Sequence, residues 1–320
     1  MDLTEYLEDT AKQVDKLLYR YFGETCGDLG VASSHLLLAG GKRLRPVMLI
    51  LSADAIRKGS SIDLMPAALA LELTHSFTLI HDDIMDGDVV RRGVPTVHTK
   101  WDMPTAILAG DVLFASAFEF IAMTDAPDKD KVRAISMLGR TCVQICEGQH
   151  MDMSFETRDD VLEGEYMKMV EKKTGVLYAA SAGIGGILAG GNPSYIDALY
   201  HFGLGIGMAF QIQDDIIDLV APPEVSGKDQ ASDIREGKKT LIAMKALEKG
   251  FDLSEFRRDI SPAEVNAVIR KLESLGVLEE VRVTARDLIN NGKKRISILP
   301  DSEEKRLLSD LADYFLARSY

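Results

Sequence analysis

Basic residues, cysteines and long apolar runs are scarce in this sequence, and each shortage argues against a class of protein. The 37 Lys and Arg are outnumbered by 50 Asp and Glu, which leaves a net charge of −13. Nonspecific nucleic-acid binding needs a basic surface, so this balance argues against it. No apolar run reaches the roughly 18 residues that a membrane-spanning helix needs, the nearest being 176–190. Because the acidic N-terminus also lacks the apolar core of a signal peptide, we expect a soluble, cytoplasmic protein.

The three cysteines do not have the spacing of a zinc finger. Cys142 and Cys146 are four residues apart within a helical pattern, and Cys26 stands alone near the N-terminus. Free cysteine is among the most buried residue types. We therefore interpret these residues as buried free thiols rather than as metal ligands.

Alternating strand patterns are also missing, whereas helical periodicity runs through most of the chain. Between residues 66 and 86, Leu69, Leu73, Phe77 and Ile80 recur at about every 3.6 residues. The same pattern predicts further helices over 104–123, 131–151, 161–190, 194–219 and 238–249. Linker-like stretches are short and lie at 87–96, 124–130, 221–237 and 291–302. Because none separates two cores, the sequence predicts one all-helical domain over residues 1–320.

Two helix starts can be placed near the C-terminus. The run Ser261-Pro262-Ala263-Glu264 combines a capping serine, a first-turn proline and a capping-box glutamate. Asp301 and Glu304 have the same spacing. We expect one helix to begin after Ser261 and another after Asp301.

An aspartate-rich heptad occurs twice. Residues 80–86, IHDDIMD, match residues 212–218, IQDDIID, at five of seven positions. On a helix, Asp82 and Asp86 share a face, and the corresponding pair in the second heptad does the same. Like charges at this spacing destabilise a helix by roughly 0.2–0.5 kcal/mol per pair. The apolar residues on both sides add to this cost, because they partly bury the charges.

Divalent cations would relieve this repulsion. Mg²⁺ commonly takes one or two carboxylates from a protein and completes its shell with water and substrate phosphates. The alternative, a solvated acidic face, suits Glu279-Glu280 better than carboxylates embedded in apolar runs. The two heptads therefore indicate two metal sites that face a shared phosphorylated substrate.

Basic residues follow where an anionic substrate would need them. Residues 40–46, GGKRLRP, place two glycines before a basic turn. Arg91 and Arg92 follow the first heptad in a short loop, and Lys228 and Lys238 follow the second. Arg binds phosphate oxygens through its planar fork, and Lys binds them as a point charge. A basic pair is usually surface charge, but its repetition after both heptads favours phosphate binding.

His75 extends the first cluster along its helix. It lies seven positions before Asp82 and eleven before Asp86, so the three fall on one helical stripe. The distance along the axis from His75 to Asp82 is about 10 Å. This spacing favours a second phosphorylated group beside the first.

The motifs together resemble a known family. In order, the sequence carries GGKRLRP, HDDIMD, RRGVPTVH, EGQHMDM, EKKTG, FQIQDDIID and GKDQASDIREGKKT. This ordered set, which spans roughly residues 40–240, resembles the trans-isoprenyl diphosphate synthase (polyprenyl synthase) family. A single DDxxD motif would be weak evidence, whereas the ordered set is specific. The resemblance is to short-chain synthases of the geranylgeranyl diphosphate type.

The resemblance implies a single-domain helical bundle with a deep central cavity, usually a homodimer. It also implies a prenyltransferase that condenses isopentenyl diphosphate with allylic diphosphates. About three Mg²⁺ ions would be held by Asp82, Asp83, Asp86, Asp214, Asp215 and Asp218. The allylic diphosphate would meet Arg91, Lys173, Lys228 and Lys238, with Thr174 and Gln211 beside its reacting carbon. Isopentenyl diphosphate would meet Lys42, Arg45, His75 and Arg92, and Gln149 and Asp152 would have supporting roles.

The implied chemistry fits these residue types. Cleavage of the allylic C–O bond leaves diphosphate as an anion, which metals, Lys and Arg stabilise. Apolar walls keep water from the remaining cation. The isopentenyl double bond attacks that cation and a proton is lost, with the released diphosphate as the expected acceptor. No protein nucleophile is required.

Phe77 and Thr78 are the expected chain-length residues. By the resemblance they help to form the floor of the cavity, and an aromatic residue at 77 is typical of C20 synthases. Thr78 lies about 40° from Asp82 around the helix and Phe77 about 140°. Phe77 therefore either walls the pocket from the side or packs in the core. Farnesyl (C15) and geranylfarnesyl (C25) products are the alternatives.

Two other functions are compatible with parts of the pattern. A class I terpene cyclase shares the fold and the first aspartate motif, but it usually has a different second motif and needs no isopentenyl site. A non-catalytic subunit of a heteromeric synthase is expected to lack some aspartates or basic residues, and none is missing here.

Overall fold

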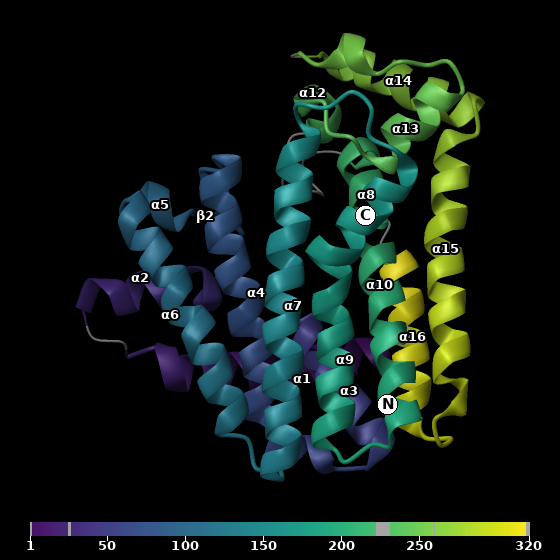
Figure 1. Cartoon of the computed structure of the whole chain (residues 1–320). Coiled ribbons are helices and arrows are strands. Elements are labelled where there is room, and N and C mark those ends of the chain that lie inside the picture. Colours follow the sequence, from purple (N-terminus) through teal and green to yellow (C-terminus); the bar gives the residue numbers. More distant parts are fainter. Residues whose placement is uncertain (1, 25–26, 222–230, 259, 318–320) are drawn as a thin grey trace. The chain divides into compact units, whose positions relative to one another are not determined.

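The computed structural model describes residues 2–24, 27–221, 231–258 and 260–317, most of which are helical (Figure 1). The first elements are α1 (Leu3–Phe22), α2 (Gly27–Leu38), α3 (Leu44–Ile56), η1 (Ser60–Leu64), α4 (Met65–Asp86), β1 (Val90–Arg91), β2 (Val94–Pro95), α5 (Val97–Lys100), α6 (Met103–Ala122) and α7 (Asp128–Phe155). They are followed by α8 (Glu163–Val170), η2 (Glu171–Gly175), α9 (Val176–Leu188), α10 (Pro193–Val220), α12 (Ser232–Glu236), α13 (Leu241–Glu248), η3 (Ser254–Phe256), α14 (Pro262–Ser274), α15 (Val277–Arg295), η4 (Ile296–Ile298) and α16 (Glu303–Ala317). The all-α prediction is confirmed.

The chain divides into two compact units. Unit 1 contains Met1–Gly139, Ala180–Tyr200 and Ile298–Leu308. Unit 2 contains Arg140–Ala179, His201–Ser297 and Ser309–Tyr320. Both units contain residues of the helices α7, α9, α10 and α16. That residues 1–320 form one domain stays a prediction.

Helix α4 lies at the centre of unit 1. Its predicted apolar stripe, Leu69, Leu73, Phe77 and Ile80, is buried throughout. The helix packs against α3 and α6, and α6 also packs against α2 (Figure 1). Full burial of one Leu or Ile side chain contributes about 1.5–3 kcal/mol, so this stripe fixes which face of α4 is left for polar groups.

Close backbone contacts hold the helices of unit 2 together. A Cβ on Gly203 would lie 2.4 Å from the carbonyl oxygen of Tyr178, and one on Gly205 would lie 2.9 Å from that of Leu288. These α10 glycines therefore let α10 approach α9 and α15 closely. The rings of Tyr178, Phe210 and Phe315 form a cluster with centroids 5.3–5.7 Å apart.

The predicted linkers are shorter than expected. Residues 87–96 contain β1 and β2, which pair antiparallel and are the only strands in the part of the chain that the structure describes. Helix α7 begins within 124–130, α12 lies within 221–237, and α15 extends into 291–302. Polar sequence alone did not separate these helical turns from loops.

One of the two predicted helix caps is correct. Ser261 Oγ accepts a hydrogen bond from the Glu264 N–H at 3.3 Å, and the Glu264 carboxylate accepts one from the Ser261 N–H at 2.8 Å. The prediction for Asp301 is wrong by one residue. Ser302 Oγ accepts from the Lys305 N–H at 3.0 Å, whereas Asp301 accepts from Lys305 Nζ at 2.9 Å.

The cysteine prediction is correct at one position. Cys142 is buried on α7, and burial together with the neighbouring Cys146 raises the pKa of its thiol to about 12. Cys146 is exposed, so its predicted burial is wrong. Cys26 lies outside the described residues.

Helix α6 qualifies the expectation that no apolar run reaches the length of a membrane-spanning helix. Among the described residues it alone has the length and composition of a spanning helix. Asp111 and Glu119 interrupt its apolar run, so no uninterrupted run of that length stands in the sequence. The core helix of a soluble protein meets the same criterion, so the finding is weak evidence for a membrane span.

Two glycines of α7 provide a test of this packing. A Cβ on Gly148 would lie 2.3 Å from the Lys173 backbone nitrogen, whereas one on Gly139 would lie 3.9 Å from the nearest atom, in Phe118. Helix propensity alone favours Ala over Gly by about 1 kcal/mol. We expect Gly139→Ala to be neutral or stabilising. We expect Gly148→Ala to lower the free energy of unfolding by about 1–3 kcal/mol, because the helices must separate.

Denaturant unfolding of the two variants measures the difference directly. Equal effects of the two substitutions would contradict the close contact between Gly148 and the Lys173 backbone.

Candidate active site

The first aspartate cluster ends α4, and its three carboxylates have different environments. Asp82 is half-buried and Asp86 is exposed, but Asp83 is fully buried. The carboxylate of Asp83 pairs with Arg91 Nε, and Arg91 Nη2 donates to Asp88 at 2.8 Å. Burial raises the pKa of Asp83, although the Arg91 charge opposes this shift. The second aspartate of the motif thus points inward, where it holds the predicted phosphate ligand Arg91.

A short hairpin carries Arg91 and Arg92. It follows Gly87, which ends α4 with a left-handed φ of 70°. Thr96 closes the hairpin, because its N–H donates to Val89 O at 3.1 Å and its hydroxyl donates to Asp88 O at 2.8 Å. The DDIMD motif and the basic pair are therefore joined by an ordered turn.

The predicted isopentenyl residues of unit 1 lie around His75. Arg45, Arg92 and His75 are half-buried, and Lys42 is exposed. Burial lowers the pKa of His75 well below its ordinary value, and the nearby Arg45 and Arg92 charges lower it further. The imidazole is therefore neutral at physiological pH. The structure thus brings His75 close to two of its three predicted partners.

The second aspartate cluster, at the end of α10 in unit 2, repeats the arrangement. Asp214 and Asp218 are half-buried, whereas Asp215 is buried. The hydroxyl of Tyr166 donates to Asp215 Oδ2 at 2.6 Å, and Gln211 Nε2 donates to Asp215 Oδ1 at 2.9 Å. Burial and the Asp233 charge raise the pKa of Asp215, while these two donors oppose the shift. Again the second aspartate of the motif points inward.

Gln211 connects this aspartate to a second predicted residue. The Thr174 hydroxyl donates to Gln211 Oε1 at 2.9 Å. Tyr166, Asp215, Gln211 and Thr174 therefore form one hydrogen-bonded chain. Tyr166 did not emerge from the sequence, because it lies 49 residues from Asp215 and no local spacing links the two.

Asp218 fixes the chain beyond the second cluster. It accepts hydrogen bonds from Ser232 Oγ at 2.5 Å and from the Asp233 N–H at 3.1 Å. Asp233 in turn pairs with Lys238 at 2.9 Å. Burial lowers the pKa of Lys238, but the Asp233 and Glu236 charges outweigh it and the net shift is upward. Lys228, predicted to act with Lys238, lies outside the described residues.

Lys173 and Thr174 lie on η2, a π-helical turn between α8 and α9. Such turns are rare and occur frequently at functional sites. Lys173 Nζ donates to Asp152 Oδ2 at 2.5 Å. Gly148 allows α7 to reach this turn, so the motifs EGQHMDM and EKKTG meet in the structure. Asp152 is thus a direct partner of Lys173, and Gln149 is buried on the same helix.

The carboxylates fit Mg²⁺ when a substrate supplies further ligands. No three His, Cys, Asp or Glu of the described residues lie close enough together to hold a metal ion by themselves. Carboxylate oxygens are hard ligands, and Mg²⁺ prefers a few of them together with water and phosphate. This donor set matches a metal that arrives with a diphosphate.

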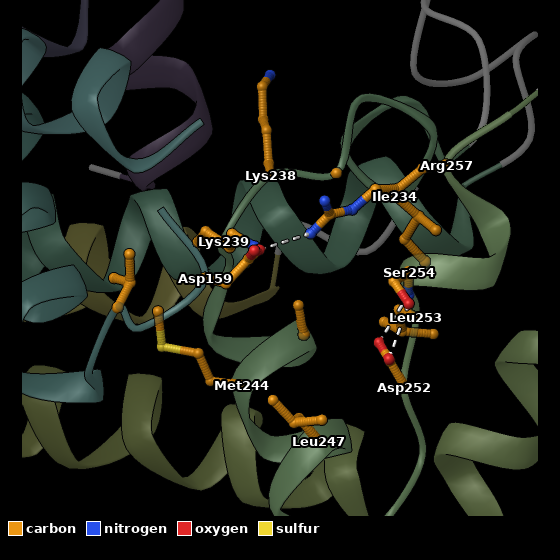
Figure 2. Close-up of a pocket in the computed structure, with 13 residues that line it drawn as sticks. Asp159, Ile234, Lys238, Lys239, Met244, Leu247, Asp252, Leu253, Ser254 and Arg257 are labelled. Atoms are coloured by element: carbon orange, nitrogen blue, oxygen red, sulfur yellow. Dashed lines mark hydrogen bonds and ion pairs between the residues drawn. The ribbon is translucent and has the colours of Figure 1, made fainter. Parts of the chain in front are cut away.

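A pocket in unit 2 is lined by one of the residues that the sequence predicted to bind the allylic diphosphate (Figure 2). Its charged groups pair with one another: Asp159 contacts Lys239 at 3.1 Å and Arg257 at 4.0 Å. The predicted residue, Lys238, points away from this pair in Figure 2. The pocket therefore offers no group that is poised for an anionic substrate.

Comparison with known protein families gives a match that covers most of the chain. The polyprenyl synthetase family model matches residues 28–271. The chain belongs to the polyprenyl synthetase family. It is therefore an isoprenyl diphosphate synthase, as the ordered motifs predicted.

Named relatives extend over nearly the whole chain. A geranylgeranyl pyrophosphate synthase of Geoglobus acetivorans is 47% identical and covers 99% of this chain and 100% of its own length. A geranylfarnesyl diphosphate synthase of Natronomonas pharaonis is 46% identical over 90% of this chain and 89% of its own. The crystal structure of a Pyrococcus horikoshii geranylgeranyl pyrophosphate synthetase superposes with a TM-score of 0.91 at 39% identity, covering 99% of this chain and 98% of that one.

Tyr166→Phe tests whether the hydrogen bond from Tyr166 holds Asp215 in its inward position in this synthase. The substitution removes a buried donor and leaves Asp215 Oδ2 without it, so we expect the free energy of unfolding to fall by about 1–3 kcal/mol. Turnover should fall as well, because Gln211 and Thr174 belong to the same chain of hydrogen bonds.

Tyr19→Phe is the matched control, since Tyr19 is 58% exposed, and it should change stability by less than about 0.5 kcal/mol. If Tyr166→Phe behaved like this control in chemical denaturation, the proposed support of Asp215 would be wrong.

Proposed function

We propose that this synthase condenses isopentenyl diphosphate with C5 to C15 allylic diphosphates and stops mainly at geranylgeranyl diphosphate (C20). The observation that carries the proposal is the repeated cluster, in which an inward aspartate is held by the protein and the flanking aspartates share the opposite side of each helix. The geranylgeranyl synthase relatives support the C20 product. Because a C25 synthase is almost as similar, C25 is the first alternative and C15 the second.

Mg²⁺ is the proposed cofactor, at about three ions for each active site. Asp82, Asp86, Asp214 and Asp218 would hold it. Asp83 and Asp215, which the sequence predicted as further ligands, we instead propose to orient these carboxylates and their basic neighbours, because they are buried against Arg91 and Tyr166. When bound, the metal neutralises the charge that develops on the leaving diphosphate.

The protein's own side chains would bind the two diphosphates and surround the reacting carbon. Arg91, Lys173, Lys228 and Lys238 would bind the allylic diphosphate, with Asp152 aligning Lys173 until the substrate arrives. Thr174 and Gln211 would lie beside the reacting carbon, where their dipoles stabilise the allylic cation. Lys42, Arg45, His75 and Arg92 would bind isopentenyl diphosphate. The released diphosphate would take the proton, so no side chain must act as a base.

Phe77 is proposed to limit product length through its packing. Its ring meets Phe114 of α6 at 5.2 Å and His81 at 6.0 Å, both in edge contacts. Phe77 is buried, and the hydroxyl of Thr78 donates to His75 O at 2.8 Å. Both residues are thus fixed in place, which suits a rigid floor for the cavity.

We also propose a cytoplasmic homodimer. Ile107, Leu108 and Val112 on α6 are exposed, and covering such a face by a second copy would remove apolar surface from water.

The two rival functions are a terpene cyclase and a non-catalytic subunit. Neither would transfer isopentenyl units by itself.

A product assay tests the proposal. Labelled isopentenyl diphosphate, Mg²⁺ and separate C5, C10 and C15 starters should give chain growth that ends mainly at C20 and stops when EDTA removes the metal. Growth that ends at C15 or C25 would refute the chain length but keep the reaction. No elongation from any starter, with the protein folded by circular dichroism, would refute the proposed function and favour a rival.

A further inference from the structure

A buried ion pair lies beside the proposed isopentenyl diphosphate residues. Glu72 lies on α4 one turn before His75, and its side chain is 3% exposed. Arg43 is 1% exposed, and its Nη1 donates to Glu72 Oε1 at 2.5 Å. Buried charges are tolerated only when they are paired and hydrogen-bonded. Glu72 is therefore the counterion that allows Arg43 to be buried.

Arg43 has structural partners at every part of its guanidinium. Nε donates to Asp15 Oδ1 at 2.8 Å, and Nη2 donates to Leu37 O at 2.7 Å. These bonds hold Arg43 in a left-handed conformation with φ of 50°, which few non-glycine residues adopt. Because Lys42 and Arg45 flank Arg43 in the chain, this anchor sets the path of the turn that carries them.

Arg92 is attached to the same turn. Its Nη1 donates to Gly40 O at 2.7 Å and to Leu36 O at 3.1 Å. Its guanidinium packs on Gly41, where a Cβ would lie 3.3 Å from Arg92 Cζ. Nη2 of Arg92 is 3.8 Å from Glu72 Oε1. Glu72 thus faces two arginines, one tightly paired and one at the edge of ion-pair distance.

Glu72 lies among several cations. It pairs with Arg43 and is 3.8 Å from Arg92. Burial lowers the pKa of Arg92 and the charges of Arg43, Arg45 and Arg91 lower it further, whereas the charge of Glu72 raises it. Without a carboxylate here the cations would repel one another and spread. With it, they stay together.

We propose that Glu72 is a positioning residue for isopentenyl diphosphate. It anchors Arg43 and draws Arg92 toward residues 40–46, so that the cations are arranged before the diphosphate binds. Groups that are preorganised in this way lose less freedom on binding, which strengthens affinity. The inference rests on the proposed function, since it names a residue that supports one of its two substrates.

Glu72→Gln is the direct test, because glutamine keeps the size and an acceptor oxygen but not the charge. We expect the KM and the Kd for isopentenyl diphosphate to rise about tenfold, as loss of one charge-assisted interaction predicts. The KM for the allylic substrate should stay within about twofold, because the two arginines that Glu72 faces, Arg43 and Arg92, are not among its proposed residues. Asp15→Asn is the matched control, since it removes the other carboxylate on Arg43 but leaves Glu72 beside Arg92; its effect on isopentenyl diphosphate should be smaller. An unchanged Kd in Glu72→Gln would overturn the proposal.

A double variant separates positioning from folding. Arg43→Met with Glu72→Met replaces the buried pair by apolar side chains, a change that often preserves stability. If Glu72 only holds the fold, this variant should regain both the wild-type Tm and the wild-type KM for isopentenyl diphosphate, which would refute the proposal. The proposal predicts a KM that stays raised even where the Tm is regained. If the Tm is not regained, the Kd of Glu72→Gln, measured well below its own Tm, decides.

The elongation activity of the wild-type protein separates a failure of this inference from a failure of the proposed function. Absence of elongation by the wild type refutes the function itself. Elongation by the wild type together with normal isopentenyl diphosphate binding by Glu72→Gln refutes only the role of Glu72.

Discussion

Charge that is held away from water is the constraint on which the rest of this structure depends. Each aspartate cluster places two carboxylates four residues apart beside a third that is buried, and such charges repel one another. The second aspartate of each cluster points inward and is paired with a donor, which is Arg91 for Asp83 and Tyr166 for Asp215. The flanking carboxylates are then presented together on the remaining side of the helix. A divalent metal brought by a diphosphate would complete that arrangement under the proposed function.

The same principle governs the cations. Arg43 is buried because Glu72 and Asp15 pair with it, and Lys173 is aligned by Asp152. Opposite charges inside the protein therefore fix the geometry of groups that we propose to meet opposite charges in the substrate. Preorganised groups of this kind need little rearrangement when the leaving group develops its charge.

Sequence reasoning predicted the parts of the site that depend on local spacing. The shared face of Asp82 and Asp86, the buried stripe of α4 and the cap at Ser261 all follow from helical periodicity and capping rules. The family was predicted from the order of several motifs. These span roughly residues 40–240, a far longer pattern than the spacing within one helix turn.

Contacts between distant residues were beyond that reasoning. Tyr166 and Asp215 are 49 positions apart, and Arg43 and Glu72 are 29 apart; no periodic pattern links such pairs. Glu72 did carry a signal, because a lone acid in the apolar run LALELTH needs a buried partner, but the sequence did not say which arginine. The π-helical turn at Lys173 was missed for a related reason, since its extra residue is set by packing against Gly148 rather than by composition.

The central claim is that the inward aspartates position the site while the flanking aspartates meet the metal. A crystal structure with Mn²⁺ in place of Mg²⁺ and an unreactive allylic thiodiphosphate tests it most directly, because anomalous scattering locates each ion. We predict ions against Asp82, Asp86, Asp214 and Asp218, with Asp83 still on Arg91 and Asp215 still on Tyr166. Ions ligated by Asp83 or Asp215, with those two partners released, would contradict the account.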